Sequence, residues 1–189
     1  IVDNSEPFSA LAFRFLIVAI GFFIFSYFSK QKILVKNKYV IESLLTGVLF
    51  HGLYLGGVFF SISKGMPTGI AALIVTLQPI LTNILAGPLL NEQIGWKQWI
   101  GILLGFIGAA LVLGFDIGET IPVSGVIATF IALFAITGST IWQKKLSHNI
   151  SLSVNNMYQA IGGFVFHVLI IIFFVDAYIN FNAKFVIAM

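Results

Sequence analysis

Two long apolar runs joined by a short polar turn form the stretch from Gly69 to Gly114, and they restrict the chain to one class of fold. Pro79 stands near the middle of the first run, and residues 91–97 form the turn. A helix on the surface of a soluble protein needs a polar face, and neither run has one. Both runs are apolar around their whole circumference, which is typical of helices surrounded by lipid and by other helices.

The composition of the whole chain supports a membrane protein. Only 9% of the 189 residues are charged and 59% are hydrophobic, whereas a soluble domain is about 25% charged. The mean hydropathy is +1.03. The absence of Cys excludes disulfides and thiolate metal sites. We therefore predict an all-α integral membrane protein, folded as a multi-span helical bundle.

Six apolar segments are long enough to cross a hydrocarbon core of about 30 Å. The predicted spans are 8–28, 39–60, 69–90, 99–113, 123–142 and 152–175. Short connections force consecutive spans to alternate in direction. One side then collects seven of the basic residues, and the other has only two, Lys64 and Lys184. The seven are Lys30, Lys32, Lys36, Lys38, Lys97, Lys144 and Lys145.

This charge asymmetry predicts that the Lys-rich loops are cytoplasmic. We expect the membrane to be a bacterial inner membrane. The asymmetry also argues against a nucleic-acid surface, because the lysines lie in short loops between spans. Ile1 would then lie outside, so we expect a further span before it and another after the tail at 177–189. The segments that begin at Pro7 and Ser151 start alike at an offset of 144 and run in opposite directions. This pattern is typical of the inverted repeats of transporters.

The stretch LQPILTNILAGPLLNEQIGWKQWIGILLGFIGAALVLG resembles the fourth and fifth helices of the EamA-type drug/metabolite transporter superfamily. The residues that stand at the positions of the family pattern are Pro79, Glu92, Trp99, Gly101, Leu104 and Gly108. SALAFRFLIVA, with Arg14, resembles the second helix, and SISKGMPTGIAALIVTLQP resembles the turn between the third and fourth helices.

This resemblance implies ten transmembrane helices in two inverted five-helix repeats. Residues 1–115 would be the first repeat without its first helix, and 116–189 the start of the second repeat. It also implies a secondary transporter of small metabolites or drug-like solutes that works by alternating access. No phosphate-binding loop or enzyme motif is present, so we expect neither ATP hydrolysis nor catalysis, and no cofactor or metal.

Two alternatives to transport stay open at this point. One is an intramembrane enzyme that uses His51 or His167, and the other is a membrane scaffold without transport activity. The expected partners are a small-molecule substrate and the lipid bilayer, and nucleic acid is not expected. A homodimer is a further option, because Gly101 with Gly105, and Gly52 with Gly56, have the spacing of a helix-packing or dimer seam.

Polar side chains inside the spans are the candidates for substrate binding, because each is costly in lipid. Arg14 could hold an anionic group or extend to the outer headgroups. His51 lies near the middle of the second span with Tyr54 on its side of the helix, and Gln78 lies at a similar depth in the third. Each could contact a ligand or hydrogen-bond to a neighbouring helix. Thr76, Pro79 and Asn83 share one face of the third span, where Pro79 is expected to kink the helix.

The sixth span has a polar stripe formed by Asn155 and Gln159, followed by Gly162 and flanked by Tyr158. Such a stripe either lines a wet cavity or makes interhelical hydrogen bonds in a closely packed interface. The clustering of amides favours the cavity. Glu92 is expected to cap the fourth span, where a carboxylate favours the helix N-terminus.

Overall fold

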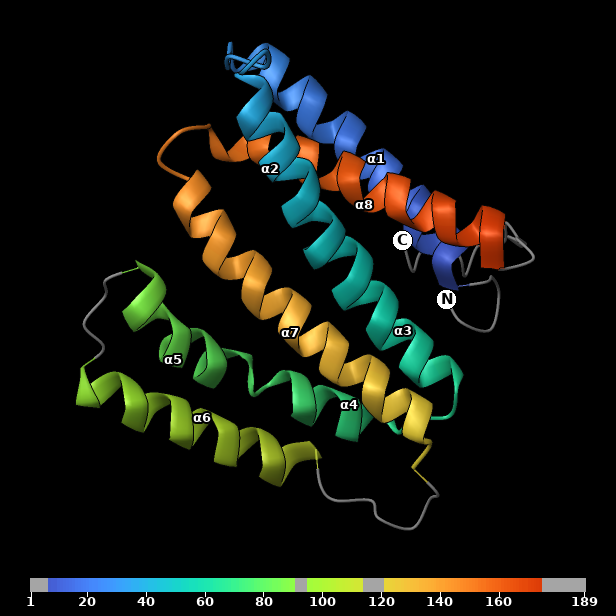
Figure 1. The fold of residues 1–189 in the computed structure, drawn as a ribbon, viewed down its shortest axis with the longest axis vertical. Coiled ribbons are helices and arrows are strands. Elements are labelled where there is room, and N and C mark those ends of the chain that lie inside the picture. Colours follow the sequence, from blue (N-terminus) through green and yellow to red (C-terminus); the bar gives the residue numbers. More distant parts are fainter. Residues whose placement is uncertain (1–6, 91–94, 114–120, 175–189) are drawn as a thin grey trace. The chain divides into compact units, whose positions relative to one another are not determined.

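The computed structural model describes residues 7–90, 95–113 and 121–174, and every regular element in these ranges is a helix (Figure 1). In chain order the elements are α1 (Pro7–Phe28), α2 (Asn37–Gly47), η1 (Val48–Leu55), α3 (Gly56–Ser63), α4 (Thr68–Val75), α5 (Gln78–Leu90), α6 (Trp96–Leu113), α7 (Val123–Leu146) and α8 (Leu152–Phe174). The predicted all-α fold is confirmed for these residues. Glu92 lies outside them.

Within the ranges that the structure describes, five helical segments are long and apolar enough to cross a membrane. They are Phe8–Phe28, Asn37–Ser63, Thr68–Leu90, Val123–Leu146 and Leu152–Phe174. The remaining predicted span corresponds to α6, whose apolar part, Trp96–Leu111, is shorter. The fifth predicted span was ended too early, because α7 continues through Gln143, Lys144 and Lys145. These are good helix formers, and cations favour the C-terminal end of a helix.

The chain divides into two compact units, residues 1–52 with 146–189 and residues 53–145. In the first unit, α8 packs along both α1 and α2. Phe8 contacts the ring of His167, and Phe15 lies beside Gly163. Because the later residue of α1 meets the earlier residue of α8, these two helices are antiparallel. This agrees with the predicted alternation of the spans.

The second span and α8 run in the same direction and approach closely at glycines. Gly47 lies against the main chain of Gln159, and Gly52 lies against the ring of Phe166, which a Cβ on Gly52 would approach to 2.6 Å. No larger residue fits at either glycine without displacing its neighbour. The packing role predicted for Gly52 is therefore confirmed.

A π-helical segment, η1, interrupts the α-helix of the second span between α2 and α3. Its i→i+5 hydrogen bonds make a turn wider than the 3.6 residues of an α-helix. Residues five apart, such as Gly47 and Gly52, therefore come to the same side. An uninterrupted α-helix would turn Gly52 away from α8, so the π segment is what brings both glycines to this interface.

Two hydrogen bonds join connections of the first unit that are far apart in sequence. The hydroxyl of Tyr39, at the start of α2, donates to Oδ1 of Asn149 at 3.1 Å. The hydroxyl of Tyr158 donates to the carbonyl of Ile33 at 3.1 Å. The connection before α2 and the connection before α8 thus lie close together. The predicted topology requires this closeness, because it places both loops on the same side of the membrane.

The second unit contains α3 to α7, and a buried cluster of hydroxyl groups joins α3 to α7. Ser61 Oγ donates to the carbonyl of Gly125 at 2.9 Å and lies 2.8 Å from Oγ1 of Thr129. Thr129 also donates to the Gly125 carbonyl, at 2.8 Å. Small hydroxyl residues commonly hold membrane helices together in this way, since lipid offers no alternative partner.

Large apolar side chains cover the outer face of α6. The exposed fractions are 50% for Leu103, 65% for Leu104, 53% for Ile107 and 78% for Leu111. A monomeric soluble protein rarely exposes so continuous an apolar surface. Polar groups are instead buried at helix contacts, as Ser61 and Thr129 are. This inverted distribution is the one expected of a protein whose solvent is lipid.

Candidate substrate site

The helix of the third span is interrupted at Thr76 and Leu77, between α4 and α5. Pro79 accounts for the interruption, because it has no N–H to donate to the carbonyl four residues earlier, that of Val75. The Leu77 N–H turns instead to the carbonyl of Ile74, at 3.1 Å. The expected kink is thus a complete break, and the Val75 carbonyl loses its helical partner.

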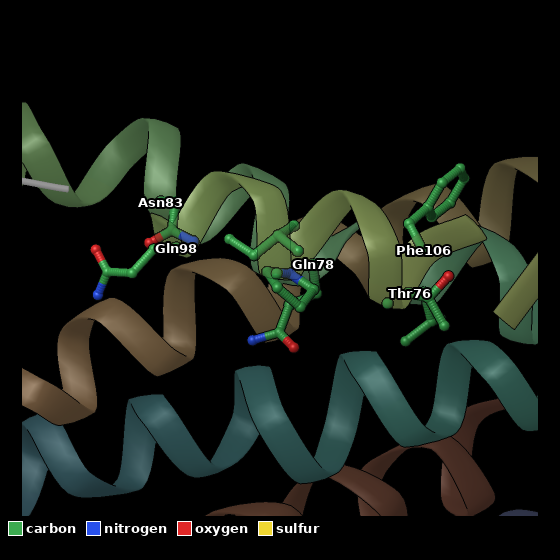
Figure 2. A pocket seen from close by; sticks show the side chains of 10 residues that line it. Thr76, Gln78, Asn83, Gln98 and Phe106 are labelled. Atoms are coloured by element: carbon green, nitrogen blue, oxygen red, sulfur yellow. The ribbon is translucent and has the colours of Figure 1, made fainter. Parts of the chain in front are cut away.

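A cavity of about 710 Å³ lies beside this break, between the α4–α5 segment and α6. Its volume is within the range of about 300–1,000 Å³ that is usual for small-molecule sites. Figure 2 shows Asn83 and Gln98 toward one end of the cavity, Thr76 and Phe106 toward the other, and Gln78 between them. The lining residues are Val75, Thr76, Gln78, Pro79, Asn83, Gln98, Gly101, Ile102, Gly105 and Phe106. We call this cavity the break pocket.

Hydrogen bonds hold two of the three amide side chains of the break pocket. Nε2 of Gln78 donates to Oγ1 of Thr140 on α7 at 3.2 Å, which leaves the amide oxygen of Gln78 as an acceptor. Oε1 of Gln98 accepts from the N–H of Gly95 at 3.0 Å and so caps the start of α6. The amide of Asn83 has no hydrogen-bond partner within the described part of the chain.

The wall that α6 contributes is open at its glycines. A Cβ on Gly101, Gly105 or Gly108 would meet no atom within 4 Å in the described ranges. Packing of Gly101 and Gly105 against another helix of these ranges was therefore a wrong expectation. Both glycines line the break pocket instead. Their use as a dimer seam stays a prediction.

In the first unit, two histidines lie against one phenylalanine ring. The ring centroid of Phe15 is 4.4 Å from that of His51 and 5.6 Å from that of His167. Nδ1 of His167 lies 2.7 Å from the carbonyl of Gly163, within its own helix. Nδ1 of His51 is buried without a hydrogen-bond partner among the described residues. Arg14, on α1, has an exposed side chain.

The polar stripe of α8 is buried. Asn155 is 1% exposed and Gln159 is 2% exposed, and the main chain of Gln159 lies against Gly47. Gly162 lies equally close to the main chain of Leu44. The amide of Asn155 has no hydrogen-bond partner in the described ranges. The stripe therefore occupies a closely packed interface, and contact of Asn155 and Gln159 with substrate stays a prediction.

The structure brings four of the predicted site residues together, namely Thr76, Gln78, Pro79 and Asn83. Five others belong to the first compact unit, namely Arg14, His51, Asn155, Tyr158 and Gln159. Tyr158 uses its hydroxyl to hold the connection before α2, and Tyr54 is half-buried in η1. Participation of these six residues in one site stays a prediction.

Residues 1–114 match the model of the EamA-like transporter family, which is more than half of the chain. The chain belongs to the EamA-like transporter family. The resemblance in the stretch from Ser61 to Gly114 is thereby confirmed, and the all-helical membrane bundle is the fold that accompanies it.

Curated relatives of this EamA-like chain include bacterial proteins that are named as transporters or efflux pumps. It is 27% identical to the uncharacterized transporter YvbV of Bacillus subtilis over 67% of the chain and 42% of the relative. It is 33% identical to a probable amino-acid metabolite efflux pump of Salmonella typhimurium over 47% of the chain and 30% of that pump. A pump of the same name in Escherichia coli is 26% identical to it over 78% of the chain and 48% of the pump. The EamA-like chain thus spans less than half the length of these relatives. No solved structure matches it significantly.

Six lining residues of the break pocket in this EamA-like chain were not among the predicted site residues, namely Val75, Gln98, Gly101, Ile102, Gly105 and Phe106. The candidate residues came from the predicted first, second, third and sixth spans, so none lay on α6. A signal was available, because Gln98, Gly101, Ile102 and Gly105 recur at the spacing of one helix face. A polar residue at the end of that glycine-rich helix face favours the lining of a pocket over a helix-packing or dimer seam.

Proposed function

We propose that the protein is a secondary transporter that moves a small solute across a bacterial inner membrane by alternating access, without ATP hydrolysis. The break pocket is the site at which the solute contacts this part of the transporter. The observation that carries the proposal is the proline-induced break beside a cavity lined by three amides and a hydroxyl. Discontinuous helices at transporter binding sites offer such unpaired main-chain groups to a solute.

Two further features support this proposal. The antiparallel pairing of α1 and α8 is compatible with the inverted repeat predicted from the segments at Pro7 and Ser151. The Tyr39–Asn149 hydrogen bond is compatible with Lys-rich loops on one side, which we assign to the cytoplasm. The names of the Salmonella and Escherichia relatives place amino-acid metabolites in the panel to be tested, both ionised compounds and uncharged derivatives. Neither the enzyme nor the scaffold hypothesis has a specific observation in its favour.

The test is uptake by proteoliposomes that contain the full-length protein, with a panel of metabolites and with or without a proton gradient. A Cβ at Gly105 meets no atom within 4 Å in the described ranges, so Gly105→Phe would place its ring in the open space of the break pocket. We expect it to lower uptake by about tenfold or more. Gly108→Phe is the matched control, since Gly108 is equally open but does not line the pocket. Equal loss in both variants, or no flux of any compound by a folded protein, would contradict the proposal.

A further inference from the structure

The side chains of the break pocket form a lining without charge. None of the ten lining residues is ionisable; four are polar and neutral, and the others are apolar or glycine. The nearest described cation in the sequence, Lys97, precedes Gln98 on α6 but is not part of the lining. Neighbouring residues on a helix do not face the same side. Among the residues that the structure describes, a solute in the pocket therefore meets hydrogen-bonding groups and no counter-charge.

This lining has a physical consequence for the solute. An ion that leaves water for an apolar site loses several kcal/mol or more of hydration unless an opposite charge compensates it. Neutral amides compensate only part of that loss, whereas they suffice for an uncharged amide or hydroxyl group. The pocket should thus discriminate strongly between molecules of one shape that differ in charge.

The arrangement of groups also describes the shape of the solute. Gly101 and Gly105 leave an open wall on α6, to which the aromatic ring of Phe106 also contributes. On the other side are the unpaired amide of Asn83 and the free amide oxygen of Gln78. An acyl chain of a lipid could fill the apolar part, but it would leave these amides without partners. A planar apolar body with a polar, uncharged edge satisfies both sides.

We infer that the break pocket selects by charge: it binds amphipathic solutes that carry no ionised group and rejects cationic and anionic analogues of the same shape. The inference rests on the proposed function in that it takes the break pocket as the site of the solute. Asn83 and Gln98, at one end of the pocket, are the residues at which a charge would change this preference (Figure 2).

The experiment measures equilibrium binding of three radiolabelled probes of similar size to the purified full-length protein in nanodiscs. The probes are benzamide, which is neutral, benzylammonium and benzoate. We expect benzamide to bind at least about tenfold more tightly than either ion. Comparable binding of an ion, or no binding of benzamide by the folded protein, would overturn the inference.

Two variants test whether the pocket itself makes the selection. Asn83→Asp preserves the shape of the side chain and adds a negative charge, so benzylammonium should bind about tenfold more tightly and benzoate should bind more weakly. Gln98→Glu should shift the order of probe affinities in the same direction. The substitution should be well tolerated, because acidic residues favour the first turn of a helix. If the order of the probes is unchanged in both variants, the selection does not arise in this pocket.

Two controls complete the design. Asn37→Asp adds the same charge at an exposed position at the start of α2 and should leave the order unchanged. Glu92 lies outside the described residues, and Glu92→Gln should also leave the order unchanged; a reversal would mean that Glu92 supplies a counter-charge and would overturn the inference. If the protein binds benzamide selectively but transports no compound, the transport proposal is refuted and the inference about charge selection stands.

Discussion

Glycines inside the helices of this protein have opposite roles. Gly47 and Gly162 lie against main-chain atoms of a neighbouring helix, whereas Gly101 and Gly105 face open space in the described ranges. The sequence shows the spacing of glycines but not what lies opposite each one. Spacing could therefore predict that some glycines form helix contacts, but it could not say which.

We expect Gly47→Ala to destabilise the protein. The new methyl group would overlap the main chain of Gln159, which cannot move as a flexible side chain could. Overpacking of this kind typically costs about 1–3 kcal/mol. The measurement is thermal unfolding of the purified protein in detergent.

Gly21→Ala is the control for this substitution. Gly21 also lies inside a long helix, α1, but a Cβ there would meet no atom within 4 Å in the described ranges. Alanine favours a helix interior over glycine by about 0.5–1 kcal/mol, so this variant should be as stable as the original or more stable. Equal unfolding temperatures of the two variants would mean that the contact at Gly47 does not constrain the protein.

At the scale of helices, interruptions of regular geometry mark both places of interest. The break between α4 and α5 lies at the pocket, and η1 carries His51 toward α8. The break could be predicted, because Pro79 has a direct steric and hydrogen-bonding effect on its own helix. The π segment could not, because its effect, the approach of Gly47 and Gly52 to α8, involves residues that are distant in sequence.

Pro79→Ala should close the break and straighten the helix. An alanine restores the N–H that the Val75 carbonyl lacks, and it fits a continuous α-helix. The chain has no Cys, so spin labels can be attached at Thr68→Cys and Leu85→Cys, both of which replace exposed residues. We expect the distance between the labels, measured by double electron–electron resonance, to increase and its distribution to narrow.

Pro88→Ala is the matched control for the Pro79→Ala variant. Pro88 lies inside α5, where the helix continues in spite of the proline. Its replacement should leave the label distance unchanged. If Pro79→Ala also leaves the distance unchanged, contacts with other helices rather than Pro79 maintain the break.

At the scale of the molecule, hydropathy gave the number and order of the helices, because lipid allows few structures other than complete helices. The helix directions within the first compact unit also agree with simple alternation, as the α1–α8 and Gly47–Gln159 contacts show. The site was predicted less completely. Thr76 to Asn83 are close in sequence, so their joint role was evident, but Gln98 and Phe106 reach the pocket from another helix.

Side-specific labelling tests the topology of the whole protein. Lys30→Cys and His148→Cys lie in two exposed connections of the first unit, and Lys64→Cys lies in the connection between α3 and α4. We expect a membrane-impermeant thiol reagent to label the first two from the cytoplasmic side only and the third from the opposite side only. Labelling of Lys30→Cys and His148→Cys from different sides would refute the predicted arrangement of the spans.

The neutral lining of the break pocket also bears on how transport could be driven. Amide and hydroxyl side chains such as those of Asn83, Gln98 and Thr76 do not change their protonation state across the physiological range of pH. The affinity of the pocket for an uncharged solute should thus be the same in acidic and in alkaline medium. If protons drive the transport cycle, they bind elsewhere in the protein. Recognition of cargo and supply of energy would then belong to different regions of the chain.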